Sequence, residues 1–174
     1  NVARRAQLFE VWIRPVVPAN GPMALRIALH ELDLFIRKGI SEADFLATRD
    51  YLMKNVYLLT STQGDELGYA LDSRWYGIGD YVPTMRERLA KLTRADVNAA
   101  IRRHLSAEKL TVVVITKDAE GLRRQLLSPD PATIAYDAPK PPEVLAEDKL
   151  IGARKLGLTA ERVRITPVAD VFAR

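Results

Sequence analysis

The chain has 174 residues, with 26 Lys or Arg and 22 Asp or Glu, so its net charge is +4 at pH 7. It is 48% hydrophobic and 28% charged, a composition typical of a globular protein and not of a disordered one. Basic and acidic residues are mixed along the sequence, whereas nucleic-acid binding calls for a basic stripe, so we expect no nucleic-acid partner. The lack of cysteine excludes a disulfide scaffold, a thiol nucleophile and an iron–sulfur site. No apolar stretch reaches the roughly 20 residues of a membrane-spanning helix.

Two segments have the composition of β-strands. In residues 8–17, the apolar Phe9, Val11 and Ile13 alternate with other residues before a proline closes the run. Residues 110–116 form a second, mostly β-branched run, and residues 163–165 predict a short third strand.

Helical periodicity and capping signals predict helices in most of the sequence before residue 128. Ser41 and Thr93 are N-cap residues with an aspartate three positions later, Asp80 is a third N-cap, and Gly39 ends the first helix. The predicted helices cover 23–38, 41 to about 60, a segment after 61–62 that runs to about 76, the segments that follow Asp80 and Thr93, and 118–127.

The part of the chain after residue 128 has a different composition. Five prolines between residues 129 and 142 predict an extended segment that cannot be a long helix. We therefore predict a domain at 1–128 and a proline-rich extended tail at 129–174 that packs on it.

The predicted fold class is α/β (α+β), an antiparallel sheet with helices packed on one face. Two isolated strands are marginal in water and cannot cover five apolar helices. We therefore expect that the sheet is incomplete here and that this sequence is a piece of a longer protein.

Neither histidine predicts a metal or catalytic site. His30 lies on a helical segment among leucines, and the positions four residues away on either side are Arg26 and Leu34, so no zinc-binding histidine pair shares its helix face. His104 falls in the last turn of a helix, where a cation is favourable. We expect no metal ligand and no cofactor-binding residue in this chain.

A donor-rich segment at residues 72–81 holds the remaining candidates for chemistry. The guanidinium of Arg74 and the hydroxyl of Tyr81 can donate to a carbonyl oxygen or an oxyanion. The alternative is a glycine-rich helix junction in which Trp75 and Tyr76 are core residues and Arg74 pairs with an acid.

The order of these segments resembles the C-terminal half-domain of pitrilysin/insulinase-type zinc metallopeptidases, which have the mitochondrial-processing-peptidase type of fold. The tail is similar to the extensions of exported bacterial members. The resemblance spans nearly the whole chain and is carried by Phe9–Val16, Gly39–Phe45, Leu92–Val97, Leu110–Val114, Lys140–Glu143, Glu147–Lys149 and Val163–Val168.

The resemblance implies a division of labour between two halves. One half binds zinc through a His-x-x-Glu-His helix, which this sequence lacks, and the other lends an Arg and a Tyr seven residues apart. Arg74 and Tyr81 have that spacing, and Tyr76 is a second candidate for the tyrosine. The expected function is thus the zinc-less half of a metalloendopeptidase, inactive alone.

The resemblance further implies its partners: an N-terminal zinc-binding half-domain or a separate zinc-bearing subunit, in a homo- or heterodimer, and a peptide substrate. A periplasmic or other extracytoplasmic location is expected. The alternative function is that of a catalytically inactive homologue that holds another subunit.

Overall fold

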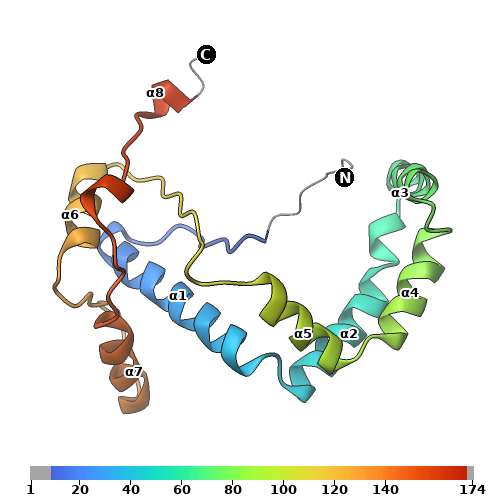
Figure 1. The fold of residues 1–174 in the computed structure, drawn as a ribbon, viewed down its shortest axis with the longest axis horizontal. Helices are drawn as coiled ribbons and strands as arrows, with labels where there is room; N and C mark the ends of the chain where they lie inside the picture. Colours follow the sequence, from blue (N-terminus) through green and yellow to red (C-terminus); the bar gives the residue numbers. More distant parts are fainter. Residues whose placement is uncertain (1–8, 172–174) are drawn as a thin grey trace. The chain divides into compact units, whose positions relative to one another are not determined.

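The computed structural model describes residues 9–171 of the chain, and its regular elements are all helical (Figure 1). Short 3-10 helices at Pro18–Asn20, Leu58–Thr60 and Ala160–Arg162 accompany the α-helices. The α-helices are α1 (Gly21–Lys38), α2 (Glu42–Asn55), α3 (Gln63–Tyr76), α4 (Tyr81–Lys91), α5 (Arg94–His104), α6 (Ala119–Leu127), α7 (Pro142–Gly152) and α8 (Val168–Val171).

The predicted α/β fold with an antiparallel sheet is wrong, because no strand occurs in residues 9–171. The described part of 8–17, together with 110–116 and 163–165, has no regular secondary structure. In the first two segments many apolar side chains are exposed, including Trp12 (85%) and Ile115 (91%). β-Branched residues favour a strand only where a neighbouring strand accepts and donates backbone hydrogen bonds, and these segments lack such a neighbour among the described residues.

The predicted helices before residue 128 are present, but the one predicted to run from 41 to about 60 ends at Asn55 and is followed by a separate 3-10 helix at Leu58–Thr60. Several helix starts follow local side-chain chemistry. Ser41 accepts a hydrogen bond from the backbone N–H of Asp44, and Thr93 accepts one from that of Asp96. Asp80 is the N-cap residue of α4 as predicted, although its side chain accepts no capping hydrogen bond.

The proline-rich segment ends earlier than predicted. Pro142 is the first residue of α7, a position where the missing N–H of proline costs nothing. The tail is therefore extended only in part, and the division into 1–128 and 129–174 stays a prediction.

Contacts between Cα atoms divide the chain into two compact units. Unit 1 includes Leu34–Ser106, and unit 2 includes Val11–Asp33 and the described residues from Ala107 onward. In unit 1, α2 packs against α4, and α3 contacts both α4 and Leu58–Thr60 (Figure 1). The buried hydrophobic side chains are Phe45, Val56 and Ile101 in unit 1 and Met23, Leu32 and Ile151 in unit 2.

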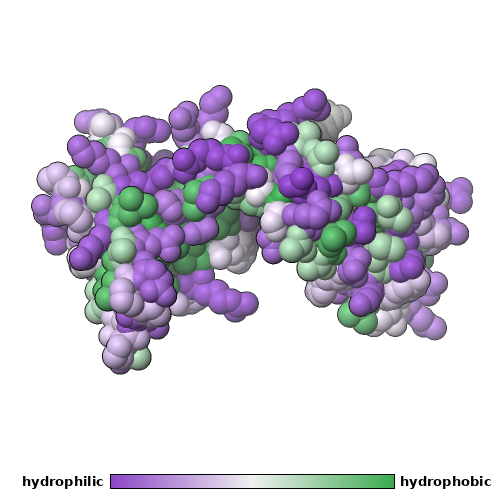
Figure 2. Space-filling view, turned by 90° about the horizontal axis from the view of Figure 1, so that it is seen from below, coloured by the Kyte–Doolittle hydropathy of each residue, from purple (hydrophilic) through white to green (hydrophobic). Residues whose placement is uncertain are grey.

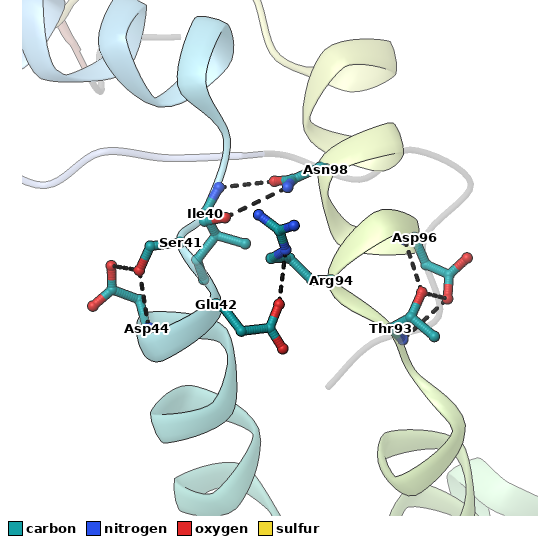
Figure 3. A network of polar contacts seen from close by, with 8 residues as sticks. All are labelled: Ile40, Ser41, Glu42, Asp44, Thr93, Arg94, Asp96 and Asn98. Atoms are coloured by element: carbon teal, nitrogen blue, oxygen red, sulfur yellow. Dashed lines mark hydrogen bonds and ion pairs between the residues drawn. The ribbon is translucent and has the colours of Figure 1, made fainter.

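Asn98, on α5, holds the turn between α1 and α2 through hydrogen bonds to the backbone of Ile40 (Figure 3). Its Oδ1 accepts from the backbone N–H of Ile40 at 2.8 Å, and its Nδ2 donates to the Ile40 carbonyl at 3.4 Å. An ion pair of 2.9 Å between Arg94 and Glu42 lies beside it. Because two long-range contacts converge on one turn, α2 and α5 are fixed relative to each other within unit 1.

Many large hydrophobic side chains of the described residues are exposed to solvent. On the face drawn in Figure 2, hydrophobic atoms lie exposed between hydrophilic ones. Among the described residues, the side chains of Val113 and Trp75 are 83% and 78% exposed.

Candidate functional site

Arg74 and Tyr81 line one groove of about 810 Å³ in unit 1. The groove is lined by α3 from Glu66 onward, the turn that follows, the first turn of α4 and Thr60. Its other lining residues are Thr60, Glu66, Tyr69, Ala70, Leu71, Ser73, Gly77, Gly79, Asp80, Val82 and Pro83.

The glycine-rich turn brings the two residues to the same groove. Gly77 is left-handed (φ 64°, ψ 33°) and ends α3, and the N–H of Ile78 donates to the carbonyl of Ser73 at 3.1 Å. This pattern is a Schellman-type helix end, in which glycine carries no Cβ penalty. The Thr84 hydroxyl then donates to the Ile78 carbonyl at 2.9 Å, which ties the turn to α4.

Tyr81 stacks on Tyr69 of α3. The ring centroids are 4.2 Å apart, with an angle of 27° between the ring planes. The pKa of Tyr81 is raised, chiefly by burial and further by the neighbouring Tyr69 hydroxyl. At neutral pH the Tyr81 side chain is therefore a protonated hydrogen-bond donor.

The other aromatic residues of the segment lie elsewhere. Trp75 and Tyr76 are exposed, not buried in the core, and neither lines the groove. Arg74 is also exposed, and no acid of residues 9–171 forms an ion pair with it. The guanidinium of Arg74 is thus available to a ligand, and Tyr76 is not positioned in the groove with it.

A second cluster of polar side chains lies in unit 2. One ligand atom from each of His30 and Glu31 on α1 and Glu147 on α7 lies within 4.8 Å of the others. The sequence does not predict this cluster, because the helix of His30 offers no second histidine on the same face and Glu147 comes from another helix. His104, at the end of α5, is exposed and belongs to no such cluster in the described part of the chain.

The two clusters have different chemical capacities. Arg74 and Tyr81 are donors that can hold a carbonyl or an oxyanion, and they include no nucleophile or general base. His30 and the two carboxylates are acceptors of the kind that bind metal ions.

Among the described residues, no helix combines the length and apolar character needed to cross a membrane. Comparisons of the chain with protein-family models, with curated proteins and with solved structures find no match.

Proposed function

We propose that this chain is the zinc-less half of a zinc-dependent metalloendopeptidase and works with a zinc-bearing half-domain or subunit. The observation that carries the proposal is that Arg74 and Tyr81, seven residues apart, line the same groove. The resemblance of the ordered sequence segments to pitrilysin/insulinase-type peptidases also motivates it, although residues 9–17 and 110–116, two of the segments that carry the resemblance, do not form the strands expected of that family.

In the proposed reaction, a zinc ion held by the other half would supply the activated water for hydrolysis of the peptide bond. Arg74 and Tyr81 donate hydrogen bonds to the carbonyl oxygen of the substrate and to the oxyanion that replaces it. Preorganised donors of this kind stabilise the transition state more than the ground state, because negative charge develops on the oxygen they face. The stack on Tyr69 limits the orientations of the Tyr81 ring.

The test uses the full assembly with its zinc-bearing half. Arg74→Ala and Tyr81→Phe should each lower kcat about 100- to 1,000-fold, the usual effect of losing one oxyanion donor, while the zinc content stays constant. Tyr76→Phe is the matched control, because Tyr76 does not line the groove, and it should leave kcat unchanged. Unchanged turnover in both Arg74→Ala and Tyr81→Phe would overturn the assignment.

A second candidate function is that of an inactive homologue that holds another subunit. The exposed apolar residues of 110–116, with Ile115 91% exposed, favour a role in assembly. This alternative predicts an assembly that forms without peptidase activity and in which Tyr81→Phe changes nothing. The proposed periplasmic or other extracytoplasmic location is tested by fractionating cells that produce the whole protein.

A further inference from the structure

We propose that His30, Glu31 and Glu147 form a binding site for a divalent transition-metal ion, with Zn²⁺ as the best match, which joins α1 to α7 in unit 2. The proposal concerns a site within this chain. It is separate from the zinc of the proposed peptidase and does not depend on that function.

The distances between the ligand atoms fit one metal ion after small side-chain movements. The three ligand atoms lie within 4.8 Å of one another, and ligands of a single zinc ion lie about 3 to 3.5 Å apart because each bond is about 2.0–2.2 Å. Glu31 and Glu147 are exposed and His30 is half-buried, so small rotations of the two carboxylate side chains bring all three to one ion.

Two contacts link α1 to the residues that follow α7, within the unit that holds the cluster. On α1, Arg26 and Asp33 lie on the same side as His30, at spacings of four and three residues. Both contact Arg154, which follows α7: Arg26 Nε donates to its carbonyl at 3.0 Å, and Asp33 pairs with its guanidinium. The relative positions of His30 and Glu147 are therefore set by contacts that do not involve a metal.

The charge of the cluster also favours a bound cation. Glu31 and Glu147 bring two negative charges together, and no Lys or Arg of residues 9–171 forms an ion pair with either. Asp33, in contrast, has Arg154 as its partner. A divalent cation would balance both carboxylates and replace their repulsion by attraction.

The donor set indicates which ion fits. An imidazole nitrogen favours zinc and other transition metals, whereas magnesium and calcium prefer sites made of oxygen atoms. Three protein ligands leave room for water on the ion, as in zinc sites that are not closed by a fourth side chain.

The test is a titration of this chain alone with Zn²⁺ against a chromophoric chelator, together with thermal unfolding. We expect one equivalent of zinc to bind, the Tm to rise on binding, and millimolar Mg²⁺ not to compete. Glu31→Gln and Glu147→Gln should each weaken zinc binding at least about tenfold. Because both residues are exposed, neither variant is expected to impair folding; His30→Ala should also abolish binding, with circular dichroism as the check on its fold.

Two matched controls locate the site. Glu143→Gln removes a carboxylate one turn earlier on α7, and His104→Ala removes the other histidine; both should bind zinc as the wild type does. The absence of zinc binding in the wild type, or equal loss in Glu143→Gln and Glu147→Gln, would overturn the proposal. Neither result bears on Arg74 and Tyr81, because the measurement involves no partner and no substrate.

Discussion

The guanidinium of Arg26 donates from Nε to the backbone carbonyl of Arg154 at 3.0 Å, across 128 positions of sequence. Arg26 is only 3% exposed, and its Nη1 also donates to the Pro22 carbonyl at 3.2 Å. Among residues 9–171, no carboxylate forms an ion pair with it, and the acceptors of its Nε and Nη1 are backbone carbonyls. Burial lowers the pKa of Arg26, although a guanidinium stays protonated in proteins.

Replacing Arg26 by methionine should destabilise unit 2. The substitution keeps an apolar stem of similar length but leaves the Arg154 carbonyl without its donor, and a hydrogen bond to a charged group contributes about 2 kcal/mol. Urea unfolding of the chain measures the change. Arg124→Met, at an exposed position of α6, is the control and should stay within about 0.5 kcal/mol of the wild type. Equal stability of the two variants would contradict the assigned role of Arg26.

Gly39 and Gly77 allow a direct comparison of two left-handed glycines. Their φ angles are 72° and 64°, but a Cβ on Gly39 would collide with the Asn98 side chain, whereas a Cβ on Gly77 meets nothing within 4 Å. Gly77→Ala should therefore cost about 1 to 2 kcal/mol for the backbone conformation alone, and Gly39→Ala should cost more. The unfolding free energies of the two variants, measured side by side, test this order.

The extra loss of stability of Gly39→Ala relative to Gly77→Ala should depend on the Asn98 side chain. In the Asn98→Ala background the collision is removed, so Gly39→Ala should cost no more than Gly77→Ala does in the wild type. Asn98→Ala by itself should cost about 1 to 2 kcal/mol, because two hydrogen bonds to Ile40 are lost. Strict additivity of the two substitutions in a double-mutant cycle would show that the contact does not act as described.

The N-cap residues Thr93 and Asp80 should differ in their contributions. Thr93 forms a complete capping box with Asp96, while the Asp80 side chain makes no capping hydrogen bond (Figure 3 shows the Thr93 cap). Thr93→Ala should cost about 1 kcal/mol and Thr93→Ser much less. Asp80→Ala should cost only the interaction of its charge with the helix dipole, at most several tenths of a kcal/mol. Thermal unfolding of the three variants ranks them.

The free energy of unfolding should fall at high pH because Tyr81 loses its phenol proton. Its pKa in the folded state is raised by burial and by Tyr69, so the folded chain holds the phenol proton more tightly than the unfolded chain does. The resulting contribution to stability is fully present below the unfolded pKa of about 10 and is lost as the pH rises through the folded pKa.

The measurement is the free energy of unfolding between pH 9 and pH 11 in the wild type and in Tyr81→Phe. The variant should lose less stability over this range. The pKa of Tyr136 is also raised, by its hydrogen bond to Asp148, and Tyr136→Phe separates the two contributions. Parallel curves for the wild type and Tyr81→Phe would mean that Tyr81 titrates normally.

The helices and their ends were predictable because their signals are local. A side chain such as Ser41 or Thr93 bonds a backbone N–H three residues away, so both partners can be read from a short stretch of sequence. The α7 helix is not predicted because Pro142 belongs to a proline-rich run, which indicates extended chain, whereas proline also fits the first helical position that Pro142 occupies.

The strands were wrongly predicted because a strand is not a local structure. Residues 110–116 have strand composition, but their backbone groups need a partner strand, and no described segment provides one. For the candidate groove, the sequence shows only that Arg74 and Tyr81 are seven residues apart. The stack of Tyr81 on Tyr69 depends on how α3 packs against α4.

The sequence by itself determined where most helices before residue 128 begin, the turn glycines and the donor-rich segment, because each depends on residues within one or two turns of chain. Only the tertiary structure decided that Glu147 lies beside His30, that Asn98 holds the Ile40 backbone, and that Arg26 is buried against the Arg154 carbonyl. These contacts join segments separated by many helical turns, and the packing of whole helices is what brings them together.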